Sequence, residues 1–398
     1  MFESLEMAPP DPIMGLTDAF TRDANPNKIN LTIGVYKDDS GRTPIFSAVK
    51  KAEERVLNEE STKSYLQIHG SAEYGQAVQK LIFGEDHEIV TSGRAVTAHT
   101  PGGTGALRVA ADFMKQVNPE ATVWLSQPTW PNHPAIFDAA NLAVKTYPYY
   151  DAENKTLDFD AMTGALDAVQ KGDVVVLHGC CHNPTGMDPD AAQWAMLAAI
   201  VRSKEALAFF DFAYQGLGNG LDEDAVGLRT FCTAGCELLV SSSFSKNFGL
   251  YRERTGALTL VAGDADIAQR SLSHMKQVIR CNYSNPPSHG AQIVTTILND
   301  PILRAEWEAE VKTMCDRIAD MRSQFVEKLK ALGVTRDFSF LTKQNGMFSF
   351  SGLNTDQVAQ LRDEYSIYIV GSGRINVASL TPGNIDAFCA AVAAVLSE

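Results

Sequence analysis

Short apolar runs recur through the first two-thirds of the chain, and helical patterns separate several of them. Strands are expected at 95–100, 123–126, 143–147, 174–178, 207–210, 238–240 and 257–261. Helices are expected at 12–21, 44–57, 73–83, 106–117 and 191–206. Nearly continuous apolar strands that alternate with helices are typical of a mostly parallel sheet covered on both faces. The pattern therefore predicts an α/β fold, in which ligands bind at the carboxyl ends of the strands.

A long helical pattern separates this region from a second one. Apolar residues recur every three or four positions from 302 to 332, Asp300 can cap the helix and Gly333 can end it. The alternation then begins again, with strands at 347–351, 367–370 and 374–377 and helices at 356–363 and 384–396. A further strand is expected at 30–36, with Gly34 inside it. The tail is predicted to form a smaller α/β domain.

Composition narrows the class of protein. The chain has 398 residues, of which 45% are hydrophobic and 21% charged, as in ordinary globular proteins of two domains. Its net charge of -14 argues against nucleic acid or an anionic membrane as a partner. No apolar run approaches the roughly 20 residues of a membrane helix, and the N-terminus has no apolar core. Seven cysteines without a CxxC pair indicate reduced thiols in a cytoplasmic protein, with no metal site.

The stretch SSSFSKNFGLYRERTG, at 241–256, raises the first chemical hypothesis. Lys246 follows an apolar run, and burial there would lower its pKa and leave a neutral amine that attacks carbonyls. The serine hydroxyls and Arg254 are groups that bind phosphate. This combination suggests a Schiff-base lysine beside an anion site. A solvated lysine in a serine-rich loop is the more common explanation for this stretch taken alone.

Two other motifs follow predicted strands. The segment PGGTG at 101–105 precedes a helix, where free N–H groups favour an anion, although a tight turn explains it equally well. Asp211 ends an apolar strand and needs a positive partner, which could be a protonated pyridine nitrogen or an ordinary arginine. Tyr214, three residues later, could point into the same cleft.

Several more side chains lie in loops after strands. Asn183 precedes a proline and presents an amide, while packing and local hydrogen bonds explain His178 and His182 better than a metal does. Trp130 and His133 lie in the proline-rich loop QPTWPNHP, where an indole is either a platform for an aromatic ring or a core residue.

Two arginines complete the set of candidates. Arg280 lies in VIRCNYSNPPSHG and Arg374 in GSGRINVAS. A surface ion pair is the usual explanation for either, but a pair of planar guanidinium forks could hold a dicarboxylate.

Together these motifs resemble the fold-type I, class I aminotransferases that use pyridoxal 5′-phosphate, and most closely the aspartate/aromatic subgroup. The resemblance runs from about 11 to 396, and its motifs occur in family order: TPGGTGALR, PTWPNH, HGCCHNPTG, DFAYQG, SKNFGLYRER, NYSNPP and NGMFSFSG. It implies a large domain at 44–313 with a mostly parallel seven-stranded sheet. It also implies a small domain at 11–43 and 314–398, and an N-terminal arm at 1–10 that lies on a partner subunit.

The resemblance also implies roles for the candidate residues. Lys246 would carry the cofactor as a covalent Schiff base, Asp211 would pair with its ring nitrogen and His133 would support Asp211. Asn183 and Tyr214 would bind the ring oxygen, and Trp130 would stack on the ring. The phosphate would be held by Gly103, Thr104, Ser243, Ser245 and Arg254, with Tyr65 of the partner subunit. A homodimer with shared active sites is therefore implied.

The implied substrates are small amino acids and 2-oxo acids in a ping-pong reaction. Arg374 would bind the α-carboxylate beside Gly34, Asn183 and Trp130, Phe348 would line the site, and Arg280 of the partner subunit would meet a side-chain carboxylate. Aspartate-preferring members are matched at Lys37, Thr43, Thr104 and Asn285. Ser64 departs from the asparagine usual there and leaves an aromatic or dual preference open.

Other functions stay possible at this point. A β-lyase or a decarboxylase could use the same lysine, and the glycine turn alone would also suit a nicotinamide-dependent dehydrogenase. A binding protein of this fold without catalytic activity would be expected to lack Lys246, Asp211 or Arg374, and all three are present.

Overall fold

The computed structural model describes residues 1–7, 14–233 and 235–397. The chain divides into two compact units: Pro44–Asp316 forms one, and Met1–Thr43 with Arg317–Glu398 forms the other. These limits lie close to the predicted domain boundaries, and the existence of two separate functional domains stays a prediction. Of the predicted arm at 1–10, residues 1–7 are exposed, and the rest lies outside the described residues.

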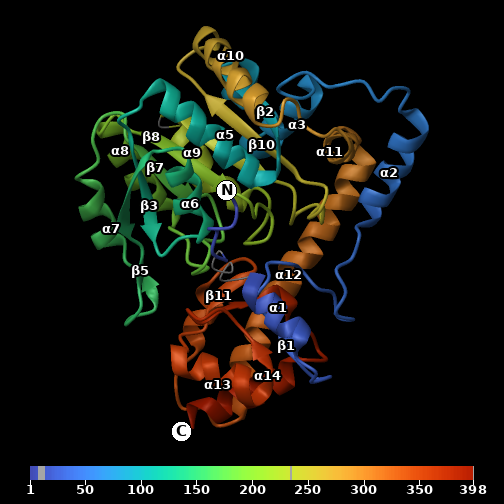
Figure 1. Ribbon diagram of the computed structural model, residues 1–398, viewed down its shortest axis with the longest axis vertical. Helices are drawn as coiled ribbons and strands as arrows, with labels where there is room; N and C mark the ends of the chain where they lie inside the picture. The colour runs from blue at the N-terminus through green and yellow to red at the C-terminus, as the bar shows by residue number, and fades with distance from the viewer. Residues whose placement is uncertain (8–13, 234, 398) are drawn as a thin grey trace. The chain divides into compact units, whose positions relative to one another are not determined.

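A seven-stranded sheet is the centre of the unit Pro44–Asp316 (Figure 1). Its spatial order is β2 (Ala95–Pro101), β10 (Thr255–Val261), β9 (Leu238–Ser243), β8 (Leu207–Phe212), β7 (Val174–His178), β3 (Thr122–Gln127) and β4 (Ala143–Pro148). Strand β10 is antiparallel to both neighbours, and the other pairs are parallel. The predicted α/β class and mostly parallel sheet are confirmed.

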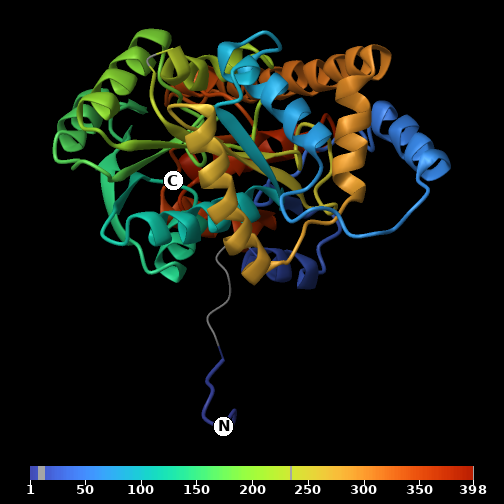
Figure 2. The same cartoon turned by 90° about the horizontal axis from the view of Figure 1, so that it is seen from above.

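Neighbouring residues of β8 show that helices cover both faces of the sheet (Figure 2). Successive strand residues point to opposite faces. Phe209 belongs to the core cluster formed with α5 (Gly102–Val117). Phe210 instead packs against Trp194 of α8 (Ala191–Ser203) and Phe231 of α9 (Val226–Thr233). An apolar strand buried on both faces is therefore what the sequence pattern required.

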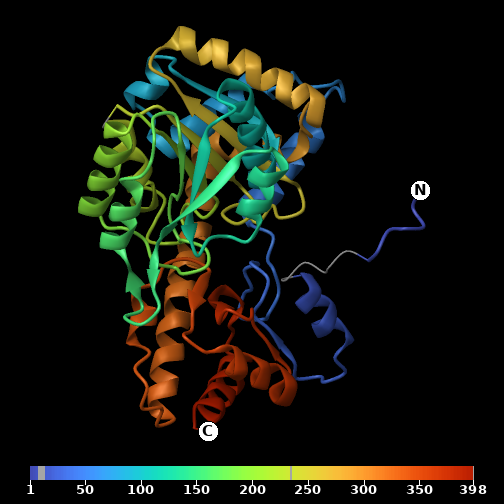
Figure 3. The ribbon, with the colours of Figure 1, turned by 60° about the vertical axis from the view of Figure 1, so that its left-hand side comes forward.

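The remaining elements of this unit surround the sheet. The helices are α2 (Ser47–Glu59), α3 (Ala72–Phe83), α4 (Glu88–Thr91), α6 (Asn132–Ala139), α7 (Phe159–Leu166), η1 (Glu223–Ala225), α10 (Ala265–Asn282) and α11 (His289–Asn299). A small hairpin pairs β5 (Tyr150–Asp151) with β6 (Thr156–Leu157). Helix α10 packs against α5 and β2 at the surface, as Figure 3 shows. Neither α10 nor α11 is among the helices predicted from the sequence.

The second unit contains two short sheets and several helices. Strand β1 (Ile29–Asn30) is parallel to β12 (Ile367–Tyr368), and β11 (Phe348–Phe350) is antiparallel to β13 (Arg374–Asn376). The helices are α1 (Met14–Arg22), η2 (Ser339–Lys343), α13 (Thr355–Tyr365), η3 (Val377–Ser379) and α14 (Ile385–Leu396). The predicted start of α1 at 12 lies outside the described residues.

The predicted strand at 30–36 is wrong beyond its first residue, because β1 ends at Asn30. The segment that follows makes backbone hydrogen bonds at Leu31 and Lys37 without forming a continuous ladder, and a side chain holds the residues between them. The amide nitrogen Nδ2 of Asn376 donates to the carbonyls of Ile33 and Val35.

The long helix is confirmed as α12 (Pro301–Ala331). The Asp300 carboxylate accepts hydrogen bonds from the N–H groups of Ile302 and Leu303, at 2.8 and 2.9 Å, which is the predicted cap. Among the described residues, no helix has the length and apolar character needed to cross a membrane.

Candidate active site

The carboxyl ends of β7, β8 and β9 bring the main candidates together. His178 of β7 is in register with Asp211 of β8, which is in register with Ser241 of β9. Lys246 follows β9 by three residues. Because three parallel neighbours end at the same edge, residues far apart in the sequence meet there, as predicted for this kind of sheet.

A chain of hydrogen bonds leads away from Asp211. Its Oδ2 lies 3.0 Å from Nε2 of His133, and Nδ1 of His133 lies 2.8 Å from the Thr129 hydroxyl. The same hydroxyl lies 3.2 Å from Nε2 of His178. Nδ1 of His178 accepts the backbone N–H of Asn183 at 3.2 Å. This last bond determines which atom donates the proton in each of the other hydrogen bonds.

The protons along this chain follow from that one acceptor. Because Nδ1 of His178 accepts, the neutral ring carries its proton on Nε2 and donates it to Thr129. The Thr129 hydroxyl then donates to Nδ1 of His133, and Nε2–H of His133 donates to Asp211. Burial, with His182 nearby, lowers the pKa of His178 well below its usual value, which keeps that ring neutral.

Asp211 is held as a carboxylate in a nearly dry place. Its side chain is 12% exposed. Burial opposes its ionisation, but the hydrogen bond from His133 and the charge of Lys246 favour it more strongly, so the pKa of Asp211 lies below its usual value. A buried carboxylate of this kind can stabilise a positive charge on a bound ring.

Lys246 lies beside this carboxylate and an aromatic ring. Its Nζ is 4.8 Å from the centroid of Tyr214. Burial lowers the pKa of Lys246 and Arg254 lowers it further, while Asp211 opposes both. The surface-lysine interpretation is therefore wrong, and the amine has the lowered pKa that a nucleophilic lysine needs.

The start of α5, the end of β9 and the segment that follows it bring a group of residues together, here called the anion cup. Its members are Gly102, Gly103, Thr104, Ser243, Ser245 and Arg254. The Ser243 hydroxyl donates to Ser245 at 3.2 Å, and Nη1 of Arg254 lies 3.5 Å from the Ser245 oxygen. The cup thus combines the N-terminus of a 16-residue helix with a guanidinium and three hydroxyl-bearing residues.

Glycine is required at the first position of the cup. Gly102 has a φ of +76°, and a Cβ there would lie 2.4 Å from Nη2 of Arg254. The missing side chain therefore leaves room for the arginine next to the helix start.

Trp130 and Asn183 lie beside the same strand ends. The Trp130 ring meets His133 edge-on, with centroids 5.3 Å apart. Asn183 is buried, and its peptide bond to Pro184 is cis. Both residues lie in the group around Asp211, and their roles there stay a prediction.

Tyr65 and Arg280 are instead surface residues of this chain. Tyr65 is 93% exposed and so extends into solvent instead of packing in the cup. Arg280 is exposed near the end of α10, where Nη1 donates to the hydroxyl of Ser284.

The other predicted substrate residues form a compact group within the second unit. The Arg374 guanidinium lies 4.1 Å from the centroid of Phe348, and Nη2 donates to the Thr32 carbonyl at 2.6 Å. A Cβ at Gly34 would lie 2.7 Å from Cζ of Phe348, so glycine allows this close approach. The buried arginine is thus fixed in one orientation, which suits the binding of a carboxylate.

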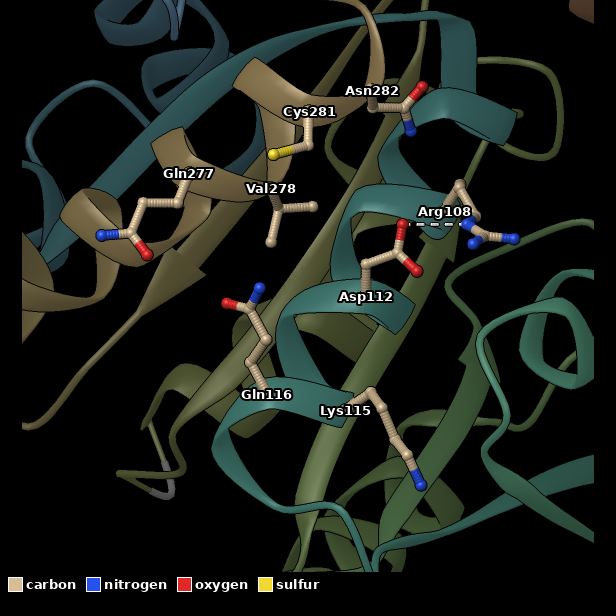
Figure 4. Close-up of a pocket in the computed structure, with 8 residues that line it drawn as sticks. All are labelled: Arg108, Asp112, Lys115, Gln116, Gln277, Val278, Cys281 and Asn282. Carbon is tan, nitrogen blue, oxygen red and sulfur yellow. Dashed lines mark hydrogen bonds and ion pairs between the residues drawn. The ribbon is translucent and has the colours of Figure 1, made fainter.

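A hollow of about 760 Å³ between α5 and α10 contains none of the predicted site residues (Figure 4). Its charged side chains are Arg108, Asp112 and Lys115, and Nε of Arg108 lies 2.9 Å from the Asp112 carboxylate. Among the described residues, this hollow lacks a lysine like Lys246 beside a buried carboxylate. We therefore place the candidate active site at the carboxyl ends of β7, β8 and β9.

Comparison with known proteins agrees with this arrangement. The family model described as aminotransferase class I and II matches residues 26–392. This chain belongs to that family. It is 56% identical over 396 residues to the aspartate aminotransferase of Escherichia coli, covering 100% of both chains. It is 45% identical to the aromatic-amino-acid aminotransferase of Pseudomonas aeruginosa, covering 100% of this chain and 99% of that one.

A solved structure gives the same result for the fold. The aromatic-amino-acid aminotransferase of Burkholderia pseudomallei, described as covalently bound to pyridoxal phosphate, has a TM-score of 0.97 and 49% identity. The match covers 100% of this chain and 99% of that one. The protein is therefore an aminotransferase of the aspartate/aromatic subgroup with the fold-type I architecture, as the motifs implied.

The sequence patterns missed one member of the aminotransferase site. Thr129 joins His133 to His178, and no motif singled it out. His178 was assigned to packing and local hydrogen bonding, and its bonds to Thr129 and Asn183 are of that kind. Its place in the chain of bonds to Asp211 depends on the alignment of β3 and β7, which periodicity does not reveal.

One group of possible metal ligands occurs among the described residues: Cys180, Cys181 and Asp224. Burial raises the pKa of both thiols, and Asp224 already accepts the N–H groups of Gly216, Gly218 and Asn219 at 2.8–2.9 Å. The Asp224 carboxylate is thus already bound by backbone N–H groups, and the two thiols are buried beside it.

Proposed function

We propose that this aminotransferase uses pyridoxal 5′-phosphate, attached covalently to Lys246, to move an amino group from L-aspartate to 2-oxoglutarate. The products are oxaloacetate and glutamate, formed by a ping-pong mechanism. The observation that supports it most strongly is the half-buried Lys246 amine, whose pKa is lowered and which interacts with both Asp211 and Arg254 of the anion cup. The aspartate aminotransferases among its relatives support the choice of substrate.

The residues present fit this cofactor. The cup offers a helix N-terminus, hydroxyls and a guanidinium, which is a donor set for a phosphate dianion. Asp211 offers a buried carboxylate whose lowered pKa suits a protonated ring nitrogen. The amine of Lys246, with its lowered pKa, suits attachment to an aldehyde.

We assign the remaining roles as follows. The phosphate would be held by Gly103, Thr104, Ser243, Ser245 and Arg254, with Tyr65 of the partner subunit. Trp130 would stack on the ring, and Asn183 and Tyr214 would bind its oxygen. His133 would hold Asp211 in position through the bond at 3.0 Å.

When bound, pyridoxal phosphate withdraws electrons from the Cα of the amino acid and so makes its proton acidic. Lys246 Nζ, which burial favours in the neutral form, would accept that proton and later return it. Tyr214, whose ring lies 4.8 Å from Nζ, would orient the amine. Asp211 would keep its negative charge during this step, because the hydrogen bond that His133 donates favours the carboxylate form.

Arg374 would bind the α-carboxylate, with Gly34 and Phe348 beside it. Arg280 of the partner subunit would bind the second carboxylate of a dicarboxylic substrate. Lys37, Thr43 and Asn285 also support an aspartate preference. Transamination of tyrosine or phenylalanine is the second candidate, because aromatic aminotransferases occur among the similar proteins and Ser64 departs from the usual asparagine.

The exposed positions of Tyr65 and Arg280 support a homodimer in which each chain supplies both residues to its partner. We also propose a cytoplasmic location for the protein. The division into two functional domains and the N-terminal arm at 1–10 belong to the same proposal. Nucleic acid and membranes are not expected partners, because the chain carries a net charge of -14.

The test is spectroscopic. The purified protein should show a visible absorbance band that sodium borohydride abolishes, and digestion should then place the reduced cofactor on Lys246. Lys246→Ala should lack the band. Release of ammonia or carbon dioxide from aspartate would instead favour a lyase or a decarboxylase.

A further inference from the structure

Strand β2 lies at an edge of the sheet and leads directly into the anion cup. Edge strands leave backbone groups without a strand partner, and these groups need other partners when they are buried. At His99 both groups have one. The His99 N–H donates to the His69 carbonyl at 2.9 Å, and the Tyr283 hydroxyl donates to the His99 carbonyl at 3.1 Å. His99 lies three residues before Gly102.

A second tyrosine holds the neighbouring strand. The Tyr74 hydroxyl, from α3, donates to the carbonyl of Gly256 in β10 at 2.8 Å. Gly256 follows Arg254 by two residues and pairs with Thr100 of β2. A Cβ at Gly256 would lie 2.4 Å from the carbonyl carbon of Gly102. The backbones held by the two tyrosines therefore come into contact at the cup.

Both hydroxyls are well suited to act as fixed donors. Tyr74 is 1% exposed, and its ring centroid lies 4.7 Å from that of His99. Tyr283 packs against the core cluster of the sheet. Burial raises the pKa of both tyrosines, so each keeps the proton that it donates.

We infer that Tyr74 and Tyr283 are positioning residues for the anion cup. Tyr74 fixes the backbone beside Arg254, and Tyr283 fixes the strand that leads to Gly102 and Gly103. Neither hydroxyl needs to touch the ligand, because each acts through a backbone carbonyl. The inference rests on the proposed function only for the identity of the ligand, a phosphate monoester on a pyridine ring.

The test compares Tyr74→Phe and Tyr283→Phe with Tyr147→Phe. Tyr147 is a matched control because it is buried and its hydroxyl donates to the Val176 carbonyl at 2.7 Å, in the same sheet but away from the cup. Full-length protein freed of cofactor is titrated with pyridoxal phosphate, with pyridoxal and with inorganic phosphate. Thermal unfolding shows that each variant is folded.

We expect both variants at the cup to bind pyridoxal phosphate and inorganic phosphate about five-fold more weakly, because a backbone that is no longer held in place must be ordered when the phosphate binds. Binding of pyridoxal, which lacks the phosphate, should be unchanged, and Tyr147→Phe should match the unaltered protein throughout. Equal losses for pyridoxal and its phosphate, or no loss for phosphate, would overturn the inference. If the unaltered protein bound phosphate but not pyridoxal phosphate, the proposed function would fail, and the phosphate titrations would still decide the inference.

Discussion

The backbone N–H of Asn183 donates to Nδ1 of His178 at 3.2 Å. One backbone group thereby sets the proton positions of two histidines and a threonine. The last bond of the series presents Nε2–H of His133 to the Asp211 carboxylate. The charge on Asp211 is therefore supported by the way the loop after β7 folds.

Thr129→Val should break this series at its centre. Valine keeps the shape of threonine but offers no hydroxyl, so the ring of His133 is no longer fixed and the pKa of Asp211 should rise. We expect kcat/KM for transamination to fall about ten-fold, in line with one or two lost hydrogen bonds. The acidic limb of its pH profile should move upward. Thr129→Ser keeps the hydroxyl and should behave as the unaltered enzyme; equal losses in both variants would contradict the account.

Asp224 should make stability depend on pH. Burial, with Asp188 nearby, raises its pKa from 3.8 to about 6 in the folded state. The folded protein then binds more protons than the unfolded chain between these values, so stability from this group is lost as pH rises through that window. The difference between the two pKa values corresponds to a loss of about 3 kcal/mol in the free energy of unfolding once both forms are ionised.

The measurement is urea unfolding of the unaltered protein and Asp224→Asn at pH 4 and pH 7. Between pH 4 and pH 7, the difference between their free energies of unfolding should shift by about 2 kcal/mol in favour of the variant, because part of the effect is already present at pH 4. The intrinsic effect of asparagine on stability cancels in this comparison. A difference that stays constant with pH would show that Asp224 titrates normally.

Gly256→Ala should damage both the fold and the cup. The added Cβ would lie 2.4 Å from the carbonyl carbon of Gly102, and two paired backbones cannot easily move apart. We expect the free energy of unfolding to fall by about 2–4 kcal/mol, with weaker binding of pyridoxal phosphate. Gly164→Ala is the control, since it lies in α7 with nothing within 4 Å of its Cβ, and it should stabilise slightly. Equal free energies of unfolding for Gly256→Ala and Gly164→Ala would contradict this prediction.

Shared active sites can be tested by mixing inactive chains. Lys246→Ala removes the nucleophile of a chain's own site, and Arg280→Ala removes the residue proposed to act on the partner. Each variant alone should transaminate aspartate poorly. After random reassociation about a quarter of the sites would be intact, because half the dimers are mixed and each has one complete site. If no activity returned while mixed dimers were present, Arg280 would not act in the partner's site.

The sequence predicted those parts of the fold and site that depend on local pattern. Apolar runs ending in Asp211 or leading to Lys246 located two strand ends and the polar groups after them. The strand at 30–36 failed because Asn376, far along the chain, binds the carbonyls of that segment. Helix α10 could have been found, since Ala268, Leu272, Met275 and Ile279 recur at spacings of three and four.

Other features lay beyond the reach of a sequence pattern. Thr129 entered the site through the register of two strands, and Tyr74 and Tyr283 act on carbonyls more than 180 residues away. Such contacts depend on tertiary packing, which periodicity does not report. The resemblance implied the site residues as a set, and the structure supplies the bonds among those around Asp211.

The most direct test is a steady-state assay of the purified protein with 2-oxoglutarate and aspartate, tyrosine or phenylalanine as donor. We predict glutamate and oxaloacetate in equal amounts from aspartate, the highest kcat/KM for aspartate, and no turnover by Lys246→Ala. Full activity of Lys246→Ala, or consumption of aspartate without formation of glutamate, would contradict the assignment of an aminotransferase that works through Lys246.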